Sequence, residues 1–187
     1  MISFFARLYS LLWFWRSSNF RRSRRIDFKS YIYGHKIQRK AKSVGRRLVV
    51  RGPVNVTRTT VIGDGCILNG LNVYGKGDVT IGNHVAIGNG TVIHSENHDY
   101  DTGRSLPFGS GWIQKPVTIE DCVWIAMNVL ILPGTHIGEG AIIQAGSVVH
   151  GYIPALAIAG GNPAKVFSWR DRKHYEVLKK SGRFAFG

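Results

Sequence analysis

Aliphatic residues recur at every sixth position between Pro116 and Ile153. Two residues before each of them stands a small or β-branched residue. This period matches neither an amphipathic helix, which repeats every 3.6 residues, nor an alternating strand, which repeats every two. It is typical of hexapeptide β-solenoids, in which each hexad supplies a short strand and a turn, and three hexads close one coil. The inward positions that we assign here are Ile119, Ile125, Ile131, Ile137, Ile143 and Val149.

A second run of hexads precedes this one, with one residue inserted before its sixth member. Its inward positions are assigned to Val50, Val56, Ile62, Leu68, Tyr74, Ile81, Ile87 and Ile93. We therefore expect eight hexads before an interruption and six after it, which makes between four and five coils. No hexad buries its aliphatic residue alone, so the stability comes from coils stacked on one another. The pattern predicts an all-β fold, a parallel β-helix.

The repeat is interrupted from His94 to Lys115 by a polar stretch that contains glycines and has no period. A long excursion inside a regular solenoid is usually functional. His98 lies in this stretch, flanked by Glu96, Asp99 and Asp101. A neutral imidazole there could accept a proton from a hydroxyl group. The other reading is an ordinary solvated loop histidine.

The repeat divides the chain into three parts. Residues 1–47 form an aromatic and basic arm and lead-in, of which 26–47 are expected to have weak local structure. Residues 48–153 form the β-helix with its loop at 94–115, and residues 154–187 form a tail. In the tail, Ser168 and Asp171 resemble a capping box and Gly182 suits a C-terminal cap. We expect a short helix from about Trp169 to Ser181, docked across the end of the coil.

The net charge of +14 belongs almost entirely to the arm. Residues 1–51 contain 14 Lys or Arg and one Asp, whereas residues 52–187 contain 11 basic and 10 acidic residues. A nucleic-acid enzyme would carry basic residues around its working surface, so no nucleic-acid partner is expected.

The first 15 residues are rich in Phe, Leu and Trp but are too few to span a bilayer. Together with the arginines that follow, they favour an interfacial helix and peripheral contact with an anionic membrane through residues 1–25. The alternative is a helix packed on the protein itself or on a neighbouring subunit. Cys66 and Cys122 lie inside the hexads and are interpreted as packed thiols in a reducing compartment.

The hexads, the loop beginning HSENHDYD, the return VTIEDCVWIAMNVLILPGTHIGEGAIIQAGSVV and the closing AGGNPAKV together resemble the hexapeptide-repeat acyltransferases. The nearest branch contains the galactoside and maltose O-acetyltransferases and the O-acetyltransferases of polysaccharide and lipopolysaccharide. The resemblance covers about residues 50–167. It implies a left-handed parallel β-helix, a homotrimer with active sites between subunits, and acetyl-CoA as acyl donor with no metal required.

The resemblance also implies roles for individual residues. His98 matches the family's general base, which takes a proton from a sugar hydroxyl so that the acetyl group is transferred directly, without an acyl-enzyme. The cofactor-binding positions that it implies are Trp124 at the acetyl end, the backbone amide of Met127 for the oxyanion, Ala145 beside the pantetheine arm and Lys165 near the phosphates. Asn69 matches a substrate-contacting asparagine across a one-residue gap.

Two departures from the family pattern bear on the ligands. His150-Gly151-Tyr152 stands where relatives commonly have Thr-Lys-Asp, so Lys165 or the basic residues of the tail would have to meet the coenzyme A phosphates. The N-terminal helical region of the maltose and galactoside enzymes is replaced by the basic arm. The expected acceptor is therefore a sugar in a surface polysaccharide, lipopolysaccharide or lipid-linked glycan, and the expected location is cytoplasmic, at the inner face of the cell membrane.

Three other functions remain open from the sequence. One is N-acetylation of a nucleotide-linked amino sugar. Another is a zinc β-helix of the γ-carbonic anhydrase type, with His84, His94 and His98 as ligands. The third is a non-catalytic scaffold.

Overall fold

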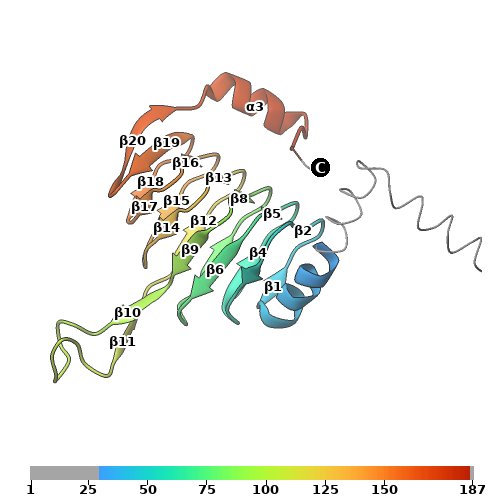
Figure 1. Ribbon diagram of the computed structural model, residues 1–187. Helices are drawn as coiled ribbons and strands as arrows, with labels where there is room; N and C mark the ends of the chain where they lie inside the picture. The colour runs from blue at the N-terminus through green and yellow to red at the C-terminus, as the bar shows by residue number, and fades with distance from the viewer. Residues whose placement is uncertain (1–29, 186–187) are drawn as a thin grey trace, which may run out of the picture.

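The protein forms a β-helix with three flat faces in a computed structural model that describes residues 30–185 (Figure 1). Face A contains β1 (Ser43–Val44), β4 (Thr60–Ile62), β7 (Val79–Ile81), β12 (Val117–Ile119), β15 (His136–Ile137) and β18 (Tyr152–Ile153). Face B contains β2 (Val49–Val50), β5 (Ile67–Leu68), β8 (Ala86–Ile87), β13 (Trp124–Ile125), β16 (Ile142–Ile143), β19 (Ala157–Gly161) and β20 (Ala164–Trp169). Face C contains β3 (Val54–Asn55), β6 (Leu71–Tyr74), β9 (Thr91–His94), β14 (Leu130–Ile131) and β17 (Val148–Val149).

Every pairing along the coil is parallel, and the chain visits faces A, B and C in turn. This confirms the predicted left-handed parallel β-helix. Ile119 stacks on Ile137, Ile125 on Ile143 and Ile131 on Val149. These inward residues are fully buried in one core. Face A holds six strands, so the coil is longer than the four to five turns expected from the hexads.

The extra length comes from the start of the coil. The first strand, β1, pairs in parallel with β4. It begins at Ser43, seven residues before Val50, the first inward position that the sequence pattern identified. Residues 30–40 form a helix whose Ile37 is 1% exposed and packs into the core. The expectation of weak local structure in residues 26–47 is therefore wrong from residue 30 onward. This helix covers the first coil and was not predicted from the sequence.

The inward assignment of Tyr74 is also wrong. The chain turns one residue early at Gly70, which has φ +156°, so that Val73 takes the inward position in register with Ile93. Val73 is 1% exposed, whereas Tyr74 points outward and is 47% exposed. An aliphatic interior offers no partner for a phenol hydroxyl, which explains why valine is accommodated there.

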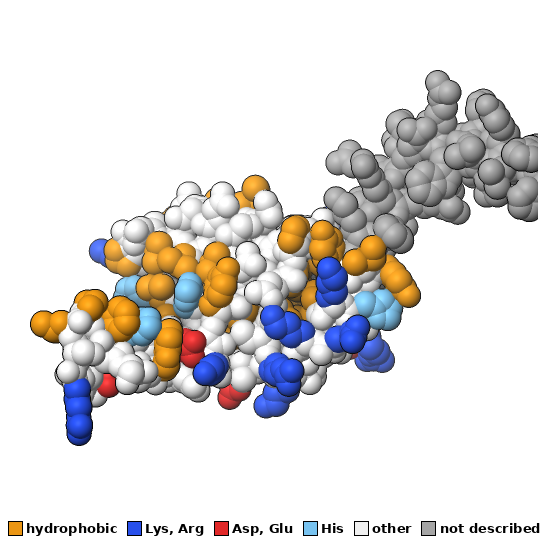
Figure 2. Space-filling model, turned by 60° about the horizontal axis from the view of Figure 1, so that its bottom comes forward, with side chains coloured by type: hydrophobic (Ala, Val, Ile, Leu, Met, Phe, Trp, Pro, Cys, Tyr) orange, Lys and Arg blue, Asp and Glu red, His pale blue; other side chains and the backbone are white. Residues whose placement is uncertain are grey.

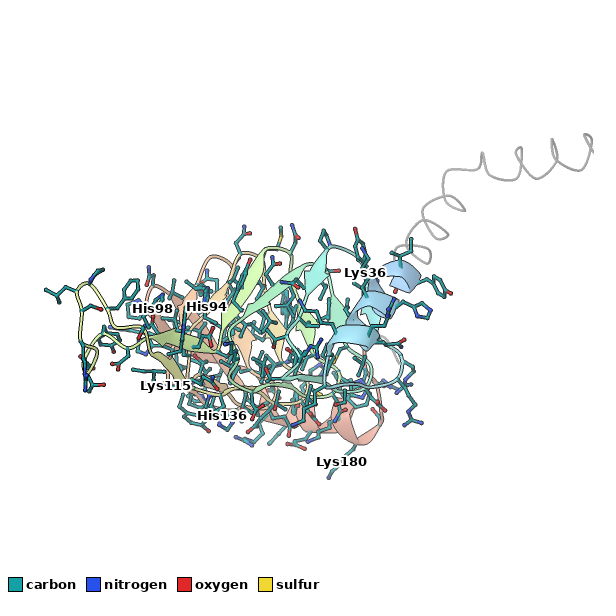
Figure 3. All side chains as sticks on the ribbon, turned by 90° about the horizontal axis from the view of Figure 1, so that it is seen from below. Lys36, His94, His98, Lys115, His136 and Lys180 are labelled. Atoms are coloured by element: carbon teal, nitrogen blue, oxygen red, sulfur yellow. The ribbon has the colours of Figure 1, made fainter. Side chains whose placement is uncertain are left out.

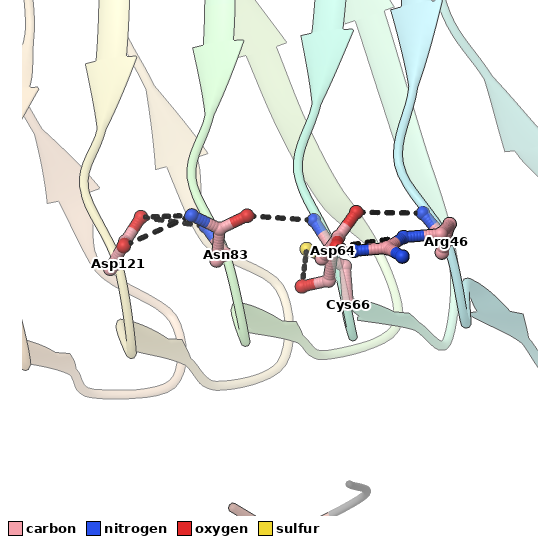
Figure 4. A network of polar contacts seen from close by, with 5 residues as sticks. All are labelled: Arg46, Asp64, Cys66, Asn83 and Asp121. Atoms are coloured by element: carbon pink, nitrogen blue, oxygen red, sulfur yellow. Dashed lines mark hydrogen bonds and ion pairs between the residues drawn. The ribbon is translucent and has the colours of Figure 1, made fainter. Parts of the chain in front are cut away.

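A column of polar side chains connects successive coils along the edge between faces A and B, as Figure 4 shows. Asp64 Oδ1 accepts from Arg46 N at 2.8 Å, Asn83 Oδ1 from Asp64 N at 2.8 Å, and Asp121 Oδ1 from Asn83 N at 2.7 Å. The hydrogen bonds from Arg46 lower the pKa of Asp64. The column satisfies corner amides that the strands leave unpaired.

The C-terminal helix, α3 (Arg172–Lys180), is confirmed but differs in extent and position. Its N-cap is Asp171, whose side chain accepts from His174 N at 2.6 Å. It begins after Trp169 because residues up to Trp169 form β20, antiparallel to β19. Tyr175 packs over Gly140, so α3 lies along the A–B edge rather than across the end of the coil (Figure 1). Among the described helices, none has both the length and the apolar character needed to cross a membrane.

Candidate active site

The segment that interrupts the hexads leaves the coil at the edge between faces C and A. It is not structureless, because β10 (Glu96–His98) pairs with the antiparallel strand β11 (Trp112–Gln114) to form a hairpin. His98 lies directly opposite Trp112 in this pairing. Figure 3 shows His98 on the hairpin, beyond His94 and at the opposite side of the molecule from Lys36. The hairpin therefore carries the candidate base away from the body of its own chain.

The imidazole of His98 is held between two aromatic rings. Its centroid is 3.8 Å from that of Phe108, with an interplanar angle of 18°, and 4.0 Å from that of Trp112, with an angle of 34°. Two rings this close to one centroid must lie on its opposite faces, since they cannot interpenetrate. The edge of the ring, which carries both nitrogens, is the part left for hydrogen bonding. We call these three residues the aromatic clamp.

The turn beyond His98 is fixed by Asp99. Its carboxylate accepts from Thr102 N at 2.9 Å and from Thr102 Oγ1 at 2.7 Å. These bonds lower the pKa of Asp99. Its backbone carbonyl accepts from Gly109 N at 2.8 Å, and its N–H donates to Gly111 at 3.1 Å. Asp99 therefore organises the loop through its carboxylate and, through its backbone, holds the return segment that brings Phe108 and Trp112 to the imidazole.

Three of the expected ligand-binding residues line the edge between faces B and C. Met127 and Ala145 occupy the same corner position of successive coils, because Ile125 is in register with Ile143. Both are exposed. Asn69 lies at this edge two coils before Met127 and is half-buried. Lys165 lies on β20, opposite Gly160. Gly160 directly follows Ala159, which stacks on Ile143 in the next coil.

The close stacking at this edge depends on a glycine. A Cβ at Gly88 would lie 2.6–2.7 Å from the backbone of Ala126 and Met127. The carbonyl of Met127 accepts from Gly146 N at 2.9 Å. Its N–H makes no hydrogen bond with any residue in the range 30–185. An exposed corner with a free amide can stabilise a developing oxyanion.

Trp124 lies on face B, 53% exposed, in line with Ala86 and Ile142. It lines a cavity of about 630 Å³ between this face and the C-terminal segment. The other residues that line it include Cys122, Tyr175, Phe184 and His84, and Phe184 stacks on His84 at 3.7 Å. The sequence analysis assigned Trp124 to the acetyl end but did not foresee that α3 would lie beside it.

Within one chain the hairpin and the B–C edge do not meet. His98 leaves from the C–A edge, and the whole of face C separates that edge from Met127 and Ala145. His84, His94 and His98, the ligands considered for zinc, do not converge either. His84 lies at the A–B edge against Phe184, and His94 stacks on Tyr74 at 5.3 Å. Across the described residues, no group of three or more His, Cys, Asp or Glu could hold a metal ion.

Phe108 and Trp112 are the functional candidates that sequence reasoning missed. Their signal was present, since they are large aromatic residues in an otherwise polar loop. Their distance from His98 in sequence, ten and fourteen residues, hid the contact until the hairpin register was known. Cys66 and Cys122 are both free thiols, as expected.

Comparison with known proteins shows which family the chain resembles. Residues 116–151 match the family model of the bacterial transferase hexapeptide (six repeats). A protein of Schizosaccharomyces pombe named as an acetyltransferase is 41% identical over 90 residues, 46% of this chain and 41% of its own length. WcaF of Escherichia coli, named as an acetyltransferase of colanic acid biosynthesis, is 29% identical over 130 residues, 68% of this chain and 69% of WcaF. The chain thus spans less than half of the first relative and about two thirds of the second.

Solved structures extend the likeness over most of the chain. A hexapeptide-repeat acetyltransferase of Vibrio cholerae superposes with a TM-score of 0.67 at 30% identity, covering 76% of this chain and 82% of that one. The same protein has also been solved with acetyl coenzyme A. A galactoside acetyltransferase in complex with coenzyme A superposes with a TM-score of 0.65 at 28% identity, covering 76% of this chain and 72% of that one. The coil, its interrupting hairpin and these likenesses together establish that the chain belongs to the hexapeptide-repeat acetyltransferases.

Proposed function

We propose that this protein transfers the acetyl group of acetyl-CoA to a sugar hydroxyl in a surface polysaccharide, lipopolysaccharide or lipid-linked glycan. The observation that carries the proposal is the aromatic clamp, which presents the edge of a histidine on a hairpin that projects from a hexapeptide coil. The donor is supported by the Vibrio cholerae relative solved with acetyl coenzyme A. The class of acceptor is supported by the galactoside enzyme and by the naming of WcaF.

In the proposed reaction, His98 accepts the proton of the acceptor hydroxyl while the oxygen of that hydroxyl attacks the thioester carbonyl. The negative charge that develops on the carbonyl oxygen is met by the N–H of Met127. The carbon–sulfur bond then breaks, and the imidazolium returns its proton to the leaving thiolate. The products are the O-acetyl ester and free coenzyme A. No acyl-enzyme forms, so neither cysteine takes part in the reaction.

Coenzyme A would lie along the B–C edge, with its pantetheine arm beside Ala145, its acetyl end towards Trp124 and its phosphates near Lys165. Asn69, at the same edge, would contact the acceptor. A second copy of the chain would supply His98 to this edge, because each chain's own hairpin leaves from a different edge. We propose a homotrimer, in which three such sites are equivalent.

The acceptor would be met at the inner face of the cell membrane. Residues 1–25, which lie outside the described part of the structure, supply the apolar and basic side chains for peripheral contact with anionic lipid.

The experiment that tests this function is incubation of the full chain with acetyl-CoA and candidate glycans, followed by mass spectrometry before and after mild alkali. We expect acetylated glycan that loses its acetyl group in alkali, because esters are hydrolysed under conditions in which amides survive. We expect the rate to fall by roughly 10²–10⁴ in His98→Ala, the range for loss of a general base. An alkali-stable product would assign N-acetylation instead. Full activity of His98→Ala would refute the assigned base.

A further inference from the structure

The net positive charge of the described residues lies at one end of the coil. Residues 30–58 contain eight Lys or Arg and no Asp or Glu, whereas residues 59–185 contain ten basic and ten acidic residues. All eight side chains belong to exposed residues. They are Lys36, Arg39, Lys40, Lys42, Arg46, Arg47, Arg51 and Arg58.

The fold brings these residues together as a surface. β1, β2 and β3 are the terminal strands of faces A, B and C, and the helix of residues 30–40 covers the coil that they form. The eight residues lie on this coil and its covering helix, and we call this surface the basic end. Figure 2 shows Lys and Arg side chains gathered there. Within this surface, Arg46 pairs with Asp64 at 3.0 Å and Lys40 donates to Asn55 at 2.7 Å.

The same helix exposes apolar side chains beside its charges. Tyr31 is 66% exposed and Ile32 is 37% exposed, and Lys36 follows them in the next turn. A polyanion in water, such as a nucleic acid, binds the charges but offers an isoleucine no apolar environment. A bilayer surface with anionic headgroups offers both, because apolar groups enter the acyl boundary while basic groups meet phosphates.

We propose that the basic end is a docking surface for an anionic phospholipid membrane, formed by the folded domain itself and separate from residues 1–25. The coil then stands with its covering helix, residues 30–40, against the bilayer. The hairpin leaves after β9, two coils beyond β3, which places its root about 10 Å from the terminal strand at the usual spacing between strands. Where the proposed function holds, this height brings the reaction within reach of an acceptor whose sugar is held close to the headgroups.

The test is vesicle co-sedimentation of the full chain with phosphatidylcholine vesicles, with or without about one quarter phosphatidylglycerol. We expect the triple variant Lys36→Gln, Arg39→Gln, Lys42→Gln to bind the anionic vesicles at least roughly tenfold more weakly, because each basic residue near such a surface contributes to binding. The matched control is Arg104→Gln, Lys173→Gln, Lys180→Gln, which removes three charges that are also exposed but lie outside the basic end. We expect it to bind within about twofold of the unmodified chain. Binding should weaken with added salt.

Three results would overturn the proposal: unchanged binding of the triple variant, an equal loss in the control, or tighter binding of the unmodified chain to double-stranded DNA than to vesicles. A charge-conserving variant, Lys36→Arg, Arg39→Lys, Lys42→Arg, should bind as the unmodified chain does, which separates loss of charge from loss of fold. The readout needs no catalysis. A chain that fails to acetylate any glycan but binds vesicles as described would refute the proposed function and leave this surface standing.

Discussion

At the scale of single residues, the aromatic clamp fixes the orientation of a histidine that lies on a projecting hairpin. A base on a projecting hairpin lacks the dense packing that fixes side chains in the coil. Phe108 and Trp112 supply it locally by covering both faces of the His98 ring. Misplacement of a catalytic group by about 1 Å can cost as much as 10²-fold in rate, so holding this ring has direct catalytic value.

The clamp leads to a prediction for Trp112. Trp112→Leu should lower kcat by roughly tenfold or more with little change in KM for acetyl-CoA, because the residue stacks on the base and is not among the residues assigned to the cofactor. Trp112→Phe keeps an aromatic face and should recover most of the rate. Steady-state kinetics with acetyl-CoA varied at a fixed acceptor concentration measure both constants. Equal rates for the Leu and Phe variants would show that stacking on His98 is not what Trp112 contributes.

A second prediction concerns the buried thiol of Cys66. Burial raises its pKa to about 11, and its Sγ lies 3.1 Å from the carbonyl of Gly82. Alkylating reagents attack the thiolate, so iodoacetamide at pH 8 should leave Cys66 unmodified in the folded protein. The same reagent should label it in urea. Peptide mass spectrometry distinguishes the two states, and rapid labelling of the folded chain would mean that the coil opens at this corner.

At the scale of elements, α3 is held to the coil through one carboxylate. Glu139 Oε1 accepts from Tyr175 Oη at 2.7 Å and from Lys179 Nζ at 2.5 Å. Burial opposes the charge of Glu139, but the hydrogen bonds from Lys179 and Tyr175 outweigh it and lower its pKa. The hydrogen bond to Glu139 raises the pKa of Lys179. The charges of Glu139 and Lys179 therefore add to the packing of Tyr175 in holding α3 on the coil.

The pKa directions define the pH range of this stabilisation. A lowered folded pKa in Glu139 gives stability that is present above its usual 4.5 and is lost as the pH falls through the lowered value. A raised pKa in Lys179 gives stability that is present below its usual 10.5 and is lost at higher pH. Lys179→Gln should therefore lower the free energy of unfolding by about 0.5 kcal/mol at pH 7, since both groups are partly exposed, and by much less near pH 3.

Urea denaturation at the two pH values measures that difference. Lys180→Gln, one residue further along the helix and exposed, is the matched control and should change little at pH 7. A deficit of Lys179→Gln that stayed the same at pH 3 would mean that the lysine acts through packing rather than through the charge of Glu139.

The elements also divide into those that local sequence specifies and those that it does not. The hexads were predictable because each coil repeats the same packing problem, and Ile119, Ile125 and Ile131 solve it identically. The early turn at Gly70 was not predictable. It moves the inward position from Tyr74 to Val73, and this shift of one residue leaves the visible period of the sequence unbroken. The helix of residues 30–40 has a single buried aliphatic, Ile37, within a basic stretch, so no apolar stripe marked it.

The candidate site follows the same division. His98 was identifiable as a histidine outside the repeat, whereas Met127 and Ala145 were assigned only through the resemblance to the hexapeptide-repeat acyltransferases. The contacts of Phe108 and Trp112 with His98 depend on the register of β10 and β11, which an aperiodic loop sequence does not encode in a readable form.

At the scale of the whole molecule, the topology separates the two halves of the proposed site. His98 leaves the coil at the C–A edge, while Met127 and Ala145 line the B–C edge. In a closed ring of identical subunits, the hairpin of one chain can reach the B–C edge of the next, and every site is then built from two chains. Such a shared site allows two different inactive chains to complement each other, which is impossible in a monomeric enzyme.

Two inactive variants should restore activity when they assemble together. His98→Ala removes the base, and Ala145→Trp places a bulky side chain over the exposed corner where the cofactor would lie, so each should be inactive alone. In trimers formed from equal amounts of both, a site works when its hairpin comes from the Ala145→Trp chain and its edge from the His98→Ala chain. Random assembly gives this pairing in about one quarter of all sites, and in one of the three sites of every mixed trimer, so we expect purified mixed trimers to have about one third of the unmodified specific activity.

Co-expression of the two variants with different tags, followed by purification on both, isolates the mixed trimers for assay. The control mixes the separately purified variants under conditions in which subunits do not exchange, and it should show no recovery. Tandem-purified trimers that remain inactive would indicate that hairpin and edge act within one chain, which would require the hairpin to fold back across face C. Recovery to about one third would instead assign the two halves of each site to neighbouring subunits, as the separation of the two edges leads us to expect.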